Sequence, residues 1–233
     1  MLLSAISSGM SFQDILLAII VRIPAVLLAI SGHEAAHGWM AYKRGDPTAK
    51  LLGRITLNPV KHFDLIGMLS MLLVGFGWAK PVPFNPRNFK KYRLDTALVA
   101  LAGPISNFIM AAIALFVYFA CRAVLGFFLV SGAAAQIISI LLEMILMICF
   151  LNISLGVFNL IPIPPLDGSK VLFSFLPARA FNFILNYERY GFLILVIVLF
   201  TGILDVPINM LMNWVYQLLY NVVIWPFTLL GLL

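Results

Sequence analysis

Charged residues and cysteines are both scarce in this chain. Only 10% of the 233 residues are charged and 63% are hydrophobic, whereas an average soluble domain has about 25% charged residues. A soluble domain needs more charge than this to cover its surface, and a disordered chain would contain far fewer apolar residues. The mean hydropathy of +1.06 therefore indicates a membrane protein, and at about 20 residues per span the length allows five or six spans.

The sequence also gives no sign of a disulfide framework or of a cleavable signal peptide. The two cysteines, Cys121 and Cys149, lie in apolar stretches and form no CxxC motif, so there is no clear disulfide framework. The N-terminal segment MLLSAISSGM has no lysine or arginine and lacks the basic region of a cleavable signal peptide. The formal net charge is +6. In so apolar a chain, basic residues act as topology signals, so we expect a lipid bilayer and no nucleic acid as a partner.

The apolar runs predict an all-α polytopic membrane protein that forms a single domain over residues 1–233. Five spans are expected from the lengths of these runs. They are three core spans at about 15–42, 96–121 and 134–160, and two additional spans at about 190–204 and 208–230.

The segment between the first two core spans is less regular. Residues 48–58 mix β-branched residues with glycine and proline, which predicts short strands or a loop. Residues 65–78 are apolar but too few for a full span, which favours a re-entrant or interfacial segment over a sixth span.

Basic residues are concentrated on one side of this arrangement. Ten of the 15 lysines and arginines lie between Lys43 and Arg93. If residues 65–78 do not cross, all ten face the same side, and the positive charge makes that side cytoplasmic. The N-terminus is then outside and the C-terminus inside.

The first predicted span contains His33-Glu34-Ala35-Ala36-His37. Residues four apart on a helix share a face and lie about 6 Å apart along the axis, so both imidazoles can reach one metal ion. This is the HExxH arrangement of zinc hydrolases, in which two histidines bind zinc and the glutamate acts as general base. The chain has only 3 histidines, and ionisable residues inside a span are costly, which favours a functional reading over a chance match.

A catalytic zinc ion usually takes a third protein ligand. Asp167 follows Ile-Pro-Ile-Pro-Pro at the end of the third span, at a depth compatible with His33 and His37 in the predicted topology. Asp167 could equally cap a helix that begins at Gly168. His62, in the basic loop, is the next candidate ligand.

Three motifs in order resemble one known family. They are the HEAAH of residues 33–37, Gly-Pro-Ile-Ser-Asn at 103–107, and Asn-Leu-Ile-Pro-Ile-Pro-Pro-Leu-Asp-Gly at 159–168. Together they resemble the site-2 protease family of intramembrane zinc metalloproteases, in a compact bacterial form without extra domains. The resemblance implies one zinc ion per chain and assigns roles to eight residues: His33, His37 and Asp167 as ligands, Glu34 as general base, Asn159 as a substrate-binding or carbonyl-polarising residue, and Gly103, Pro104 and Asn107 as structural support.

The resemblance also implies a substrate and a location. The substrate would be a transmembrane segment of another protein, cut near the cytoplasmic face, and the enzyme would lie in the bacterial inner membrane with its basic loops cytoplasmic. Two other functions fit parts of the sequence. A metal transporter could use His33, His37 and Asp167 as a transit site, although transport would not need Glu34 beside them. A non-catalytic membrane scaffold would need none of these residues, and the sequence gives no oligomeric state.

Overall fold

The structure is a computed structural model that describes Gly9 and residues 11–62, 64–67, 69, 80–126, 128, 131–177 and 190–232. Within these residues the regular structure is helical, and no residue lies in a strand. Three helices are long and apolar enough to cross a membrane: α2 (Phe12–Lys43), α5 (Tyr92–Leu125) and α6 (Gly132–Asn159). They coincide with the three predicted core spans, and the chain is an integral membrane protein.

Each long helix extends a few residues beyond the span predicted for it. Hydrophobicity marks the part of a helix in the apolar layer, whereas the helix ends where its terminal backbone groups find other partners. At the start of α2, the Ser11 hydroxyl accepts a hydrogen bond from the Asp14 backbone N–H at 3.2 Å. At the other end, Gly45 adopts a φ of 107°, which favours glycine, and turns the chain away.

The two C-terminal helices do not form two clearly separate spans. The helix Tyr190–Phe200 and α9 (Asp205–Leu229) are bent by 90° at a short break and qualify as a span only together. α9 alone is too polar because amide side chains recur along it at positions 209, 213, 217 and 221. The described residues therefore contain three candidate spans, or four if the bent pair is one span. The predicted count of five is not confirmed.

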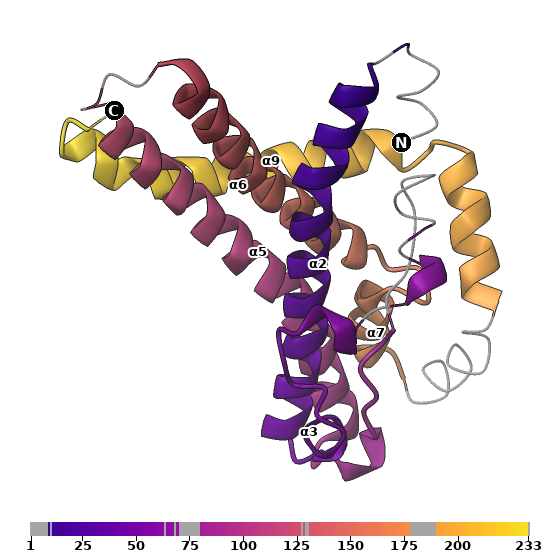
Figure 1. Cartoon of the computed structure of the whole chain (residues 1–233). Helices are drawn as coiled ribbons and strands as arrows, with labels where there is room; N and C mark the ends of the chain where they lie inside the picture. Colours follow the sequence, from indigo (N-terminus) through magenta and orange to yellow (C-terminus); the bar gives the residue numbers. More distant parts are fainter. Residues whose placement is uncertain are drawn as a thin grey trace.

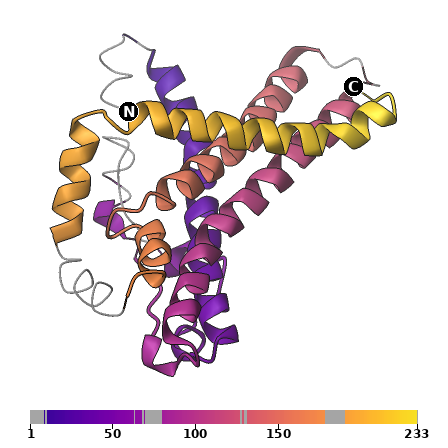
Figure 2. The same ribbon diagram turned by 180° about the vertical axis from the view of Figure 1, so that it is seen from behind.

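The long helices cross rather than form a parallel bundle. In Figure 1, α2 stands upright, α5 and α6 lean away from it, and α9 runs across α5 and α6; Figure 2 shows the same arrangement from behind. The main apolar core is shared by α5, α6 and α9 and includes Leu115, Phe119, Ile153, Val215 and Phe227. The short helix α7 (Asp167–Ser174) packs against α5. The candidate site lies where α2, α5 and α7 meet.

The loop between α2 and α5, where residues 48–58 were predicted as short strands or a loop, contains short helices and no strand among its described residues. These are α3 (Thr48–Leu51) and the 3₁₀ helices η1 (Pro59–Lys61) and η2 (Pro86–Asn88). The strand prediction for residues 48–58 is therefore wrong over α3, and no other described residue of the loop lies in a strand.

Backbone N–H groups of this loop donate hydrogen bonds to a side chain rather than to a neighbouring strand. The Asp46 carboxylate accepts hydrogen bonds from the backbone N–H of Thr48 at 3.2 Å and of Asn85 at 2.7 Å. It also accepts one from the Asn88 side-chain amide at 2.7 Å. Asp46 thereby joins the end of α2 to the segment that precedes α5.

Two parts of the predicted architecture are not described. Within the predicted re-entrant segment 65–78, residues 65–67 and 69 are helical, whereas 68 and 70–78 lie outside the described residues. Residues 178–189, between α7 and the C-terminal helices, also lie outside them. The re-entrant segment and the single-domain assignment for 1–233 stay predictions.

Candidate metal centre

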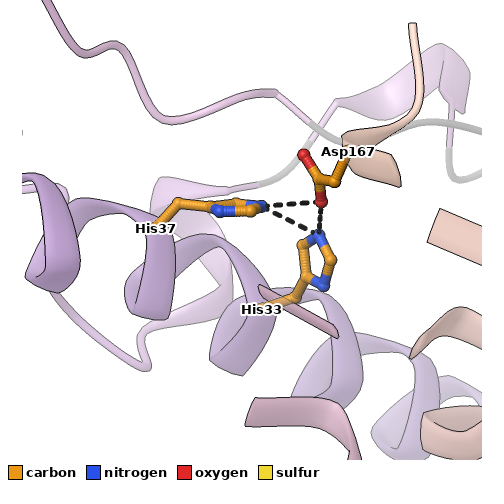
Figure 3. Close-up of side chains that lie close together, drawn as sticks. All are labelled: His33, His37 and Asp167. Atoms are coloured by element: carbon orange, nitrogen blue, oxygen red, sulfur yellow. Dashed lines mark hydrogen bonds and ion pairs between the residues drawn. The ribbon is translucent and has the colours of Figure 1, made fainter. Parts of the chain in front are cut away.

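The two histidines of the HExxH motif are buried and converge on Asp167. Their Nε2 atoms are 3.0 Å apart, and each lies 3.1 Å from Oδ2 of Asp167. Figure 3 shows the two rings on successive turns of α2 and the carboxylate facing them from α7. The fold therefore brings together all three residues that the sequence predicts as metal ligands.

The spacing of these three atoms fits a small tetrahedral metal ion. Nitrogen and oxygen ligands bind zinc at about 2.0–2.2 Å, which places two ligand atoms of a regular tetrahedron about 3.3 Å apart. The separations of 3.0–3.1 Å are close to this value. Oδ2 of Asp167 is buried and has no hydrogen-bond partner among the described residues; it faces Nε2 of His33 and of His37. Three such ligand atoms facing one another favour a cation between them.

The hydrogen bond made by Nδ1 of each histidine leaves the lone pair of Nε2 directed toward this point. Nδ1 of His37 lies 2.7 Å from the Val99 carbonyl oxygen, which can only accept, so Nδ1 carries the proton. In the neutral ring, Nε2 is then free to bind a metal. Nδ1 of His33 lies 2.6 Å from Oδ1 of Asn107, which makes the same arrangement at the second ring.

A buried network fixes the orientation of Asn107. Its Nδ2 donates to the Ala29 carbonyl at 3.2 Å and to Oδ1 of Asn152 at 2.8 Å, which leaves Oδ1 facing His33. Asn152 is held in turn, because its Nδ2 donates to the Ile148 carbonyl at 2.8 Å. Sequence reasoning missed Asn152. The available signal was an amide in the middle of an apolar span, where an unpaired polar group is costly.

Gly103 and Pro104 let α5 lie against the two imidazoles. A Cβ atom on Gly103 would be 2.5 Å from Cε1 of His33 and 2.6 Å from Nε2 of His37, so only glycine fits between α5 and the rings. Pro104 is buried in the same turn and lacks the N–H that would bond the Ala100 carbonyl. These contacts fit the structural-support role predicted for both residues, which stays a prediction.

Asp167 is held at the start of α7 by the turn that follows α6. α7 begins at Asp167 itself and has Leu166 at its N-cap position, so Asp167 is not the capping residue. Gly168 packs against the Leu160 carbonyl so closely that a Cβ would overlap it.

Glu34 lies on a neighbouring face of α2 and is partly exposed. Its Oε2 accepts a hydrogen bond from the Val82 backbone N–H at 2.8 Å. Val82 belongs to segment 80–85 of the loop before α5, which lies in no helix or strand. Glu34 is thus held by the loop and is not part of the cluster that His33, His37 and Asp167 form.

Two other predicted residues lie outside this cluster. Asn159 is the last residue of α6, is partly exposed, and donates from Nδ2 to the Leu155 carbonyl of its own helix at 2.9 Å. His62, the alternative ligand, is buried and donates from Nε2 to the Thr56 carbonyl at 2.8 Å. Neither belongs to the metal-ligand cluster found among the described residues.

An apolar groove of about 470 Å³ opens beside the motif helix. It lies between α2 and the loop segment 55–57, and its lining is Gly32, Ala35, Ala36, Trp39, Ile55, Thr56 and Leu57. Ala35 and Ala36 are the two central residues of the HExxH motif, so an apolar chain can approach the turn of α2 that carries Glu34.

The chain is similar to a peptidase family and to proteins that are named as candidate zinc metalloproteases. The model of Peptidase family M50 matches residues 21–202. The chain is 41% identical over 180 residues to the candidate zinc metalloprotease YwhC of Bacillus subtilis (strain 168), which covers 76% of this chain and 78% of YwhC. It is 27% identical over 199 residues to the candidate zinc metalloprotease Rip2 of Mycolicibacterium smegmatis, which covers 83% of this chain and 69% of Rip2. No solved structure matches the chain.

Proposed function

The chain belongs to peptidase family M50, the site-2 protease family, and is therefore a zinc metalloprotease; from this we propose that it cuts a peptide bond in or near the transmembrane segment of a membrane-protein substrate. The observation that carries the proposal is the convergence of His33, His37 and Asp167 at 3.0–3.1 Å inside a membrane protein. We assign these residues as the ligands that would hold one zinc ion per chain.

The assigned chemistry divides between the metal and the protein. A bound zinc ion polarises the scissile carbonyl and makes water a nucleophile at neutral pH. Glu34 is the general base that accepts the proton of the attacking water and then donates it to the leaving amine. Asn107 and the Val99 carbonyl hold the two imidazoles in the tautomer that presents Nε2. Gly103 and Pro104 keep α5 against the rings.

The substrate has to present an extended backbone to this site, because helical hydrogen bonds shield a peptide bond from water. The apolar groove beside Ala35 and Ala36 fits an apolar segment. Asn159, at the end of α6, is assigned to bind the unwound substrate backbone or polarise its carbonyl. We place the basic loop on the cytoplasmic side of a bacterial inner membrane, so that cleavage occurs near that face.

The test is cleavage of a candidate transmembrane substrate by purified wild-type protein and by Glu34→Gln, with zinc content measured in both. Glu34→Gln keeps size and both histidines but removes the proton acceptor, and general-base assistance typically contributes about 10²–10⁴-fold. We expect a folded protein that retains zinc and does not cut. Near wild-type cleavage by Glu34→Gln would refute the mechanism.

The zinc content of two further variants tests whether Asp167 or His62 is the third ligand. Asp167→Ala should lose zinc, whereas His62→Ala should keep it, because the His62 ring bonds the loop carbonyl of Thr56. Zinc loss in Glu34→Gln, together with metal uptake into vesicles by the wild-type protein, would favour the transporter instead.

A further inference from the structure

One buried arginine, Arg54, is bonded to the segment that holds Glu34. Only 8% of Arg54 is exposed. Its Nη2 donates to the Lys80 carbonyl at 2.8 Å and to the Pro81 carbonyl at 3.2 Å. Among the described residues no ion pair to Arg54 is found. Burying a cation against carbonyls alone is costly, which calls for a role beyond stability.

Arg54 and Glu34 each form a hydrogen bond with the same peptide group, one with its oxygen and the other with its nitrogen. The Pro81 carbonyl and the Val82 N–H belong to the same planar unit. Arg54 binds the oxygen of this unit, and Glu34 Oε2 accepts from its nitrogen at 2.8 Å. A buried cation and a carboxylate are therefore joined through one peptide bond, which a bond at each end polarises in the same sense.

Among residues 81–83, Val82 alone has a backbone N–H that can donate a hydrogen bond. Its neighbours Pro81 and Pro83 have no N–H, and their rings disfavour a helix in this segment, which has no regular secondary structure. The Val82 side chain is buried and packs toward Gly38 on the turn of α2 after Glu34. A shift of residues 80–82 would therefore move the only N–H that reaches Glu34 from this segment.

We propose that Arg54 is a positioning residue for the general base, acting through the Pro81–Val82 peptide. The proposal rests on the proposed function, because it takes Glu34 as the base. Arg54 fixes the peptide, and the peptide fixes the Glu34 carboxylate through the Val82 N–H. No contact between Arg54 and substrate is involved.

The experiment compares Arg54→Met, Val82→Pro and the double variant with wild-type protein in cleavage of a purified transmembrane substrate. Arg54→Met removes the cation, and Val82→Pro removes the N–H. We expect each to lower kcat by about 10- to 100-fold with KM little changed, the range expected for a misplaced catalytic group. The double variant should be no slower than the slower single variant, because both break the same connection.

Two further readouts do not depend on activity. Hydrogen exchange at the Val82 amide should be faster in Arg54→Met than in wild type, and zinc content should be unchanged. Arg87→Met is the matched control, because Arg87 is exposed on the same loop. Asp46→Asn controls for loop stability, because Asp46 holds Asn85 rather than Val82; it should lower the melting temperature but not kcat by a comparable factor.

The outcomes distinguish this inference from the proposed function. If Glu34→Gln is inactive but Arg54→Met has the kcat of Arg87→Met, the positioning role is wrong and the protease mechanism stands. Additive losses in the double variant would also overturn it. If Glu34→Gln is active, the proposed function itself fails. If Arg54→Met does not fold, Val82→Pro decides: against Val82→Ala, which keeps the N–H, an equal kcat would overturn the proposal.

Discussion

Gly103 is the residue at which a single added carbon has the clearest consequence. Both imidazoles beside it are fixed through Nδ1, by Asn107 and by the Val99 carbonyl, and so have little freedom to move away. Gly103→Ala would place a methyl group 2.5–2.6 Å from ring atoms of His33 and His37. We expect zinc affinity to fall by about 10- to 100-fold, as for other changes that misplace metal ligands. Competition with a zinc chelator measures it.

Two glycines provide matched controls for Gly103→Ala. A Cβ on Gly126, at the end of the same helix, would have its nearest neighbour at 3.4 Å, so Gly126→Ala should leave zinc affinity unchanged. A Cβ on Gly156 would meet the Phe108 ring at 2.6 Å, and no histidine atom is among its nearest neighbours. Gly156→Ala should therefore lower the melting temperature without a specific effect on zinc. Equal zinc loss in Gly103→Ala and Gly156→Ala would contradict this account.

The residues of the candidate site were predictable to different degrees. The spacing of His33 and His37 requires only helical geometry, and the depth of Asp167 follows from the order of the spans. Asn152 carries no local signal apart from its polarity. The Val82 N–H is a backbone group in a proline-rich segment, and nothing in the sequence shows that it lies beside Glu34. Such contacts depend on how the loop folds back on α2.

At the scale of elements, the loop between α2 and α5 depends on Asp46. Burial alone would raise the pKa of Asp46, but hydrogen bonds from the Thr48 side chain, the Asn85 N–H and the Asn88 amide outweigh it, and its pKa lies below the usual 3.8. A carboxyl with a lowered pKa in the folded state stabilises that state above its unfolded pKa. This stabilisation is lost as the pH falls through the folded pKa.

The corresponding prediction concerns acid stability in detergent. The melting temperature of the wild-type protein should fall as the pH drops below about 4, as Asp46 becomes protonated. Asp46→Asn should lose about 1–3 kcal/mol at neutral pH, the typical cost of leaving buried donors unpaired. The variant should also show a weaker dependence on pH in that acid range. Parallel curves for the two proteins would exclude Asp46 as a source of the acid sensitivity.

The helices that cross the membrane were predictable from hydrophobicity alone, whereas the start and the bend of the C-terminal helices were not. The three core spans are uniform apolar runs, and each is a helix in the structure. Residues 205–207, which lie between the two additional predicted spans, form the first turn of α9, because proline fits the first turn of a helix. The 90° bend before it depends on how α9 packs on α5 and α6, which no local pattern encodes.

For the whole molecule, the loop from Lys43 to Arg93 should face one side of the membrane. Asp46 ties the segment after α2 to Asn85 and Asn88, so the two ends of the loop meet. In a background without Cys121 and Cys149, single cysteines at Lys50 and Arg87 should react with the same impermeant reagent from the cytoplasmic side. Both positions are exposed in the structure.

A cysteine at Ser131 provides the opposite-side control. Ser131 is exposed and precedes α6, at the far end of α5 from Arg87. It should react only from the other side of the membrane. Labelling of Lys50 and Arg87 from opposite sides would mean that residues between them cross, and the predicted orientation of the spans would then be wrong.

The separation of the assigned ligands along the chain bears on when the protease becomes active during its own synthesis. His33 and His37 emerge early, whereas Asp167 emerges only after α5 and α6 have been made. At about 5–20 residues per second, that delay is about 6–26 s. During this time the growing chain carries an incomplete ligand set beside other membrane proteins. Completion of the metal centre thus depends on the third core span being in place, which confines cleavage to molecules that have assembled their core.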